Sequence, residues 1–199
     1  QIGLPGMGGE FGDYCFKDDD IAVLQSFLDN SIANQTGLFN EDTFQKYYPT
    51  DGSFNPLWVG YTEWQEVDTN QLRMVSFIGY NSYNMPVSGP MPDNIHLADQ
   101  LTSLNFADEW GSSFITSISE QINGLEELRI LLLNDNAVTG QIPDSICQNI
   151  ELLNLNLDDN FTLYNNSLCP GDDYDFDGLP NYPDCLETNG DWYNQNLKY

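Results

Sequence analysis

The segment from residue 171 to residue 185, GDDYDFDGLPNYPDC, has the spacing in this sequence that points most directly to a chemical role. Counting from Asp173, carboxylates occupy positions 1, 3, 5 and 12, glycine occupies position 6, and asparagine occupies position 9. Short oxygen-bearing side chains at alternate positions converge on one hard cation, and the glycine permits the sharp turn that this requires. The pattern predicts a calcium site whose ligands are Asp173, Asp175, Asp177, the backbone carbonyl of Leu179, Asn181 and Asp184.

The predicted cation would have a structural role. Without it, the neighbouring carboxylates of this segment would repel one another over a few ångströms. Aspartate rather than glutamate at position 12, with Pro180 and Pro183 inside the loop, argues against a helix-loop-helix site. We therefore expect Ca²⁺ to order the C-terminal region rather than to take part in a reaction. The alternative interpretation is a solvated acidic turn.

Residues suited to catalysis are few. His96 is the only histidine, which argues against a histidine-dependent triad or a histidine-rich zinc site, and we expect it in a surface loop. Neither a phosphate-binding P-loop nor a G-x-G-x-x-G motif is present. Acidic residues are numerous, but no spacing singles out a carboxylate pair of the glycosidase type. The sequence predicts a protein that is not an enzyme.

The charge balance restricts the partners. The chain of 199 residues carries 31 Asp plus Glu against 5 Lys plus Arg, a net charge of −26, which disfavours nucleic acid and anionic membranes. No apolar run is long enough to span a membrane. Four cysteines favour an oxidising compartment, a Gln at position 1 fits removal of a signal peptide, and sequons permit glycosylation at Asn34, Asn160 and Asn165. We expect a secreted or cell-surface protein.

A repeat begins at about residue 72. Its clearest form, Leu131-x-Leu133-x-x-Asn136, recurs as Leu155-x-Leu157-x-x-Asn160 and, degraded, as Leu104-x-Phe106-x-x-Glu109 and Val75-x-Phe77-x-x-Tyr80. A second motif recurs in register with it: VSGPMPDNI, FITSISEQI and VTGQIPDSI, with 27 residues from Met91 to Ile118 and 24 from Ile118 to Ile142. Each L-x-L predicts a short strand that points two apolar side chains inward and pairs in parallel with the next turn. The asparagine at the corner would bond backbone groups of neighbouring turns.

The pattern divides the chain into three parts. Residues 1–71 form an N-terminal extension and cap, in which Ile21, Leu24 and Leu28 predict a helix over 20–29. The triplet Asp18-Asp19-Asp20 before it is interpreted as N-capping and stabilisation of the helix dipole. Residues 72–160 hold about four repeats, and residues 161–199 form a C-terminal cap with the calcium loop. The predicted fold class is an α/β, β-rich solenoid.

Residues 125–143 resemble the plant-type leucine-rich repeat of extracellular proteins, which also occurs in secreted bacterial relatives. The helix at 20–29 with LWVGYTEW is similar to the N-terminal cap of that family, and NNSLCP with PNYPDC is similar to its C-terminal cap. The calcium segment resembles the loops of dockerins and thrombospondin type 3 repeats. The resemblance implies a helical N-terminal cap and a C-terminal cap stabilised by calcium and by a disulfide between Cys169 and Cys185. Alternatively, Cys147 pairs with Cys169, and Cys15 has no evident partner.

The outward residues of the four predicted strands form the candidate binding face. They line up as Met74, Ser103, Ile130 and Asn154; as Ser76, Asn105, Leu132 and Asn156; and as Ile78, Ala107, Asn134 and Asp158. Apolar side chains flanked by asparagines suit a partner that is part apolar and part hydrogen-bonding. The predicted binding residues are Ile78, Asn105, Ile130, Leu132, Asn134 and Asn156.

The predicted function is non-enzymatic recognition of an extracellular protein or glycan. An N-terminal segment folded across the face is the alternative explanation of its apolar residues. Two other functions stay open: a self-assembling subunit of a cell-surface filament or matrix, and a carbohydrate-active enzyme or its binding module.

Overall fold

The computed structural model describes residues 15–34, 61–79, 87–107, 114–149, 160–164, 166 and 183–187. Their elements, in chain order, are β1 (Cys15–Phe16), α1 (Asp18–Ala33), β2 (Tyr61–Asp68), β3 (Gln71–Ile78), β4 (Ser88–Gly89), the 3-10 helix η2 (Asp93–Leu97), β5 (Ser103–Asn105), β6 (Phe114–Ile115), η3 (Glu120–Gly124), β7 (Ile130–Leu132), η4 (Asp144–Gln148), β8 (Phe161–Thr162) and α4 (Asp184–Glu187). No helix among these residues is long and apolar enough to cross a membrane.

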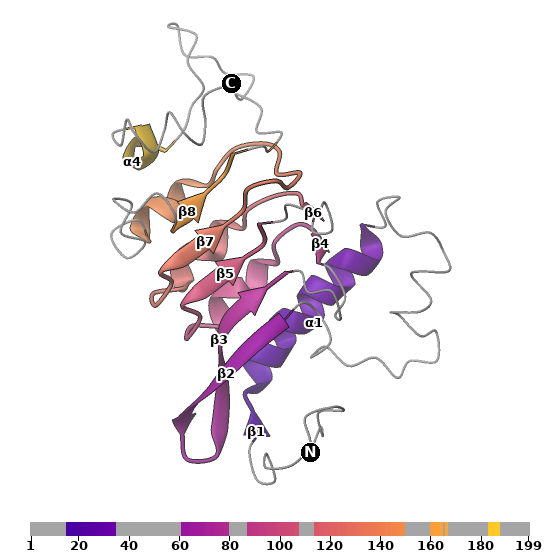
Figure 1. Cartoon of the computed structure of the whole chain (residues 1–199), viewed down its shortest axis with the longest axis vertical. Helices are drawn as coiled ribbons and strands as arrows, with labels where there is room; N and C mark the ends of the chain where they lie inside the picture. The colour runs from indigo at the N-terminus through magenta and orange to yellow at the C-terminus, as the bar shows by residue number, and fades with distance from the viewer. Residues whose placement is uncertain are drawn as a thin grey trace, which may run out of the picture.

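The elements form a coil in which successive turns lie parallel to one another. Strands β3, β5, β7 and β8 pair in parallel and place Phe77, Leu104, Leu131 and Phe161 side by side (Figure 1). Between successive strands the chain returns through the 3-10 helices, and β4 pairs with β6 to form a second, smaller parallel sheet. This architecture is an α/β, solenoid-like fold, as the repeat predicted.

The core lies inside the coil, between the strands and the 3-10 helices. All four side chains of the Phe77 row are fully buried, and so are Ile95, Ile122 and Ile146 from the three 3-10 helices. One turn alone could not bury these side chains, so each turn depends on its neighbours for stability. The first turn is covered by α1, whose Phe27 packs with ring centroids 4.9 Å from Phe77 and 5.5 Å from Phe106.

The corner asparagine performs the predicted role. Asn136 donates through Nδ2 to the carbonyl oxygen of Phe106 in the preceding turn at 2.6 Å and to that of Leu133 at 3.2 Å, and its Oδ1 accepts from the N–H of Ile115 at 2.9 Å. These bonds satisfy backbone groups that lose their ladder partners where the strand ends. The asparagine therefore joins adjacent turns at the corner.

The fourth turn differs from the prediction. Leu131 pairs with Phe161 rather than with Leu155, so the strand lies six positions later and begins one residue beyond the predicted end of the repeats. The corner residue is therefore Asn166, which donates to the carbonyl oxygens of Leu133 at 2.7 Å and Leu163 at 2.8 Å. Asn160 instead accepts the N–H of Leu131 with its backbone oxygen. Both segments carry the L-x-L-x-x-N type of pattern, so the pattern alone could not choose between them.

The first turn also differs, because β3 contains a β-bulge. Strand β2 pairs with β3 antiparallel, and the pairing steps from Glu63–Ser76 to Trp64–Met74, which leaves Val75 without a partner in β2. An extra residue reverses which side chains point inward beyond it. Met74 is consequently fully buried, and the prediction that it faces outward is wrong. The turn aligns Phe77, and not Val75, with Leu104.

A buried ion pair fixes α1 to this strand. Asp20 is fully buried, and its Oδ2 accepts both the N–H of Met74 and Nε of Arg73 at 2.9 Å. Arg73 also donates to Asp99, in the loop before β5, at 2.7 Å. The Asp20 hydrogen bond is the main cause that raises the pKa of Arg73 above its usual value. The acidic triplet lies in the first helical turn, but the N-cap is Lys17 and no side chain caps it, so the N-capping interpretation is wrong.

The disulfide differs from the one that the family resemblance implied. Cys147 in η4 is bonded to Cys185 in α4, with Cα atoms 5.7 Å apart, so Cys185 is not available to Cys169. The bond brings α4 against the last 3-10 helix, where Leu186 is fully buried. Cys169 lies outside the described residues, and Cys15 is exposed and forms no disulfide with another described cysteine.

Replacing Asp20 with alanine should lower the free energy of unfolding by about 3–5 kcal/mol, because it leaves the buried charge of Arg73 and the N–H of Met74 uncompensated. Asp18→Ala is the matched control: Asp18 is exposed in the same helical turn, so its loss should cost about 0.3–1 kcal/mol through the helix dipole. Chemical denaturation measures both values. Similar losses for the two variants would contradict the role assigned to Asp20.

Replacing Leu131 with aspartate should unfold the protein, because it buries an unpaired carboxylate between two turns; a loss above about 4 kcal/mol is expected. Leu132→Asp is the control. Its side chain lies on the other side of the strand and is only partly buried, so we expect a loss of about 1 kcal/mol. Circular dichroism during thermal unfolding distinguishes the two, and equal damage would show that the strand faces are assigned incorrectly.

Candidate binding face

The outer side of the parallel sheet, opposite the core, is the candidate binding face. Residues that pair across neighbouring strands project to the same side of a sheet, so the register defines rows of side chains. The first row is Tyr61, Ile78, Asn105, Leu132 and Thr162, and the second is Glu63, Ser76, Ser103 and Ile130. The predicted alignment of β5 with β7 is confirmed. The alignment of β3 is shifted by two residues, because Ser76 and not Met74 pairs with Ser103.

The apolar members of these rows are Ile78, Ile130 and Leu132, each partly buried. Adjacent strands lie about 4.8 Å apart, so Leu132 and Ile78 stand roughly 10 Å apart with Asn105 between them. The Oδ1 atom of Asn105 accepts the N–H of Ala107 at 3.0 Å. None of the hydrogen bonds described for this part of the chain uses the amide nitrogen of Asn105. The face therefore combines apolar side chains with an amide donor held on a rigid strand.

Asn134 does not belong to this surface in the way that the sequence suggested. It is only 5% exposed, and its Nδ2 donates to Oδ2 of Asp135 at 2.7 Å while its Oδ1 accepts from the hydroxyl of Thr162 at 2.6 Å. Asp135 itself has a left-handed backbone with φ of 59°. Asn134 supports the turn, and we leave it out of the proposed surface.

The remaining predicted site residues fall mostly outside the described residues. These are Asp173, Asp175, Asp177, Leu179, Asn181, Asn156 and Asn165. The backbone of Asp184 begins α4, and its side chain is not among the described ones. Asn34 is the C-cap of α1, and its Nδ2, the atom that would carry a glycan, is buried and has no hydrogen-bond partner among the described residues. His96 is exposed in η2, with Nδ1 3.1 Å from the carbonyl oxygen of Asp93.

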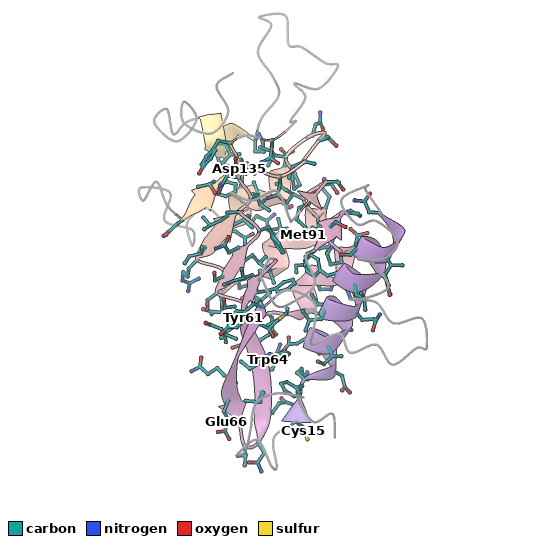
Figure 2. The ribbon with its side chains drawn as sticks, turned by 45° about the vertical axis from the view of Figure 1, so that its right-hand side comes forward. Cys15, Tyr61, Trp64, Glu66, Met91 and Asp135 are labelled. Carbon is teal, nitrogen blue, oxygen red and sulfur yellow. A yellow bond between two sulfur atoms is a disulfide. The ribbon has the colours of Figure 1, made fainter. Side chains whose placement is uncertain are left out.

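Sequence reasoning missed the part of the face that β2 contributes. Residues 61–78 read as two β-prone runs joined by Thr69-Asn70, and Asn70 adopts the left-handed backbone, φ 62°, that tight hairpin turns require. This signal would have predicted the hairpin. The hairpin adds Tyr61 and Glu63 to the two rows of side chains. Figure 2 shows Tyr61, Trp64 and Glu66 following one another along β2.

Comparison with known proteins finds similarity only among solved structures. No protein-family model and no curated protein matches the sequence. The chain is similar to the LRR ectodomain of the receptor kinase SOBIR1 from Arabidopsis thaliana, with 17% identity, a TM-score of 0.47 and coverage of 78% of this chain and 71% of that one.

Two further structures show weaker similarity. The PEPR1–AtPEP1 structure is matched at 16% identity with a TM-score of 0.43, over 76% of this chain but only 18% of that one. The BIR3–SERK2 complex from Arabidopsis thaliana is matched at 16% identity with a TM-score of 0.38, over 86% of this chain and 88% of that one.

Proposed function

We propose that the chain is a non-enzymatic, extracellular recognition protein and that the outer face of its parallel sheet binds a protein partner. The observation that carries the proposal is the position of Ile130 and Leu132. Both project from the middle of the sheet to the side away from the core, and both stay partly buried rather than fully covered. Central apolar residues surrounded by polar groups are the usual energetic centre of a protein interface.

The chemistry of the face indicates what kind of partner fits. Ser103 and Asn105 separate the apolar pair of β7 from Ile78, so a partner would bury apolar side chains and form hydrogen bonds in the same contact. Because the strands are held by backbone pairing on both sides, little conformational entropy would be lost on binding. The net charge of −26 favours a partner that presents basic residues at the rim of the contact. Among the residues of the two rows, only Tyr61 offers a ring on which a sugar could stack, so a glycan is the weaker candidate.

The double variant Ile130→Glu with Leu132→Glu should abolish binding while shifting the melting temperature by only a few degrees, because both side chains lie outside the core. Binding is measured on an array of extracellular protein domains and, in parallel, on a glycan array. The matched control is Ile32→Glu, which adds a carboxylate at an exposed isoleucine of α1, away from the sheet. Loss of binding in both variants would point to a general charge effect. Retained binding in the double variant would remove this face from consideration.

We further propose that the segment from Asp173 to Asp184 binds Ca²⁺ and stabilises the C-terminal end of the solenoid. The proposal rests on the spacing of oxygen ligands in the sequence, which matches a calcium loop at six positions. Its relation to the fold is that Cys185, next to Asp184, is tied by a disulfide to η4. Ordering of the loop would therefore act directly on the last turns of the coil.

Removing calcium with a chelator should lower the melting temperature. The free energy of unfolding should fall by about 2.7 kcal/mol if calcium was present at a hundred times its dissociation constant. Asp175→Ala should reproduce the loss and should make the protein insensitive to the chelator. Asp144→Ala, at an exposed aspartate of η4, is the control and should leave the response to calcium unchanged. Isothermal calorimetry that detects no calcium binding to the folded protein would refute the proposal.

A further inference from the structure

Strand β2 forms one end of the main sheet, and one of its edges has no partner among the described residues. It pairs with β3 along its length and with no other described strand. Of the two bulges in this hairpin, the first leaves its extra residue, Val75, on β3, and the second lies beyond Glu66. The stretch from Tyr61 to Glu66 is therefore a regular strand, and such an edge is a template for pairing with another strand.

The hydrogen bonds of β3 identify which groups of β2 point outward. The carbonyl oxygen of Val75 accepts from Thr102, and the N–H of Gly79 donates to Asn105, so the odd-numbered residues of β3 face β5. Ser76 and Ile78 consequently face β2, where their partners are Glu63 and Tyr61. Backbone groups alternate along a strand, so those of Thr62 point away from β3. No other strand among the described residues pairs with this outer edge of β2.

Side-chain contacts hold this edge in an extended conformation. The indole Nε1 of Trp64 donates to the hydroxyl of Thr62 at 2.8 Å, and its ring stands edge-on to Phe16, with centroids 4.6 Å apart. Trp64 is thereby anchored to the core on the inner side of the sheet. A strand that is already extended and anchored loses little entropy when it accepts a partner strand.

The charge of β2 selects among possible occupants. The sequence YTEWQEVD contains three acidic residues and no basic one, and Glu63 and Glu66 are exposed. A second copy of this chain, paired edge to edge, would place acidic residues beside acidic residues, and both copies carry a charge of −26. A partner strand whose basic side chains project to the outer face of the sheet would instead place these side chains beside Glu63. The edge therefore disfavours self-pairing and favours a basic strand.

We propose that the outer edge of β2 binds an extended segment of a partner protein, in which Lys or Arg alternates with apolar residues, by adding it to the sheet as a further strand. The backbone groups of Thr62 and Trp64 would pair with the added strand. Its basic side chains would lie beside Glu63 on the outer face, and its apolar side chains would lie on the inner side, beside Thr62 and Trp64. This binding mode depends on the edge of β2 and not on the apolar residues of β7.

The test uses a displayed library of short linear peptides, selected on the full-length protein and compared with three variants. Thr62→Pro removes the outward N–H while leaving the pairing with β3 intact, since proline is tolerated on an edge strand where its nitrogen faces solvent. Thr62→Val is the matched control, because it also loses the hydroxyl that Trp64 uses but keeps the N–H. Glu63→Lys changes the charge beside the added strand and leaves the edge in place.

Peptides selected on the wild-type protein should carry alternating basic and apolar residues, should bind Thr62→Val about equally well, and should lose about tenfold or more in affinity for Thr62→Pro. Glu63→Lys should select peptides with fewer basic residues. If Thr62→Pro does not fold, the shift in composition with Glu63→Lys still tests the proposal.

Three outcomes would overturn the proposal. Recovery of no peptide would mean that the bulges and acidic residues only protect the edge. Peptides that bind Thr62→Pro as well as wild type would mean that charge alone attracts them. Association of the protein with itself that Thr62→Pro abolishes would mean that the occupant is a second copy. The double variant Ile130→Glu with Leu132→Glu should still bind the selected peptides. This result distinguishes a failure of the proposed β2 edge from a failure of the binding face around β7.

Discussion

The first turn of the solenoid depends on the carboxylate of Asp20. Strand β3 pairs with β1 at its beginning and with β5 at its end, and the N–H of Met74 lies between these two partners. Asp20 accepts this N–H and the guanidinium of Arg73, which in turn reaches Asp99 before β5. Since Asp20 is fully buried, its charge is tolerable only with these partners. One side chain thus ties the helix, the first strand and the next turn together.

The periodic part of the fold could be predicted, and the positions of its ends could not. The strand of β7, the corner role of Asn136 and the pairing of Leu104 with Leu131 follow from a pattern that repeats apolar residues and asparagine in a fixed register. At both ends the pattern has two solutions. The bulge at Val75 is invisible to a count of alternating residues, because it exists only through the pairing of β3 with β2. The choice of Phe161 over Leu155 likewise depends on which asparagine reaches the carbonyl of Leu133.

The candidate face was predicted in composition more reliably than in geometry. Ile130 and Leu132 project outward because they flank the buried Leu131, which local alternation determines. Asn134 has the same alternation, yet it is withdrawn from the surface because Thr162 from the next turn and Asp135 use both ends of its carboxamide. Contacts between turns decided that case. The same holds for Cys185, whose partner was settled by the packing of α4 on η4 and not by its spacing from Cys169.

The hairpin of β2 and β3 connects the two proposed surfaces. Tyr61 and Glu63 belong through their side chains to the rows of the outer face, while the backbone of Thr62 between them belongs to the edge. A strand added to that edge would continue both rows by one position, since paired residues project to the same side. The acidic charge of β2 then has a clear consequence. It opposes the uncontrolled edge-to-edge association to which an unpaired strand is prone, and it does so without closing the edge to a basic partner.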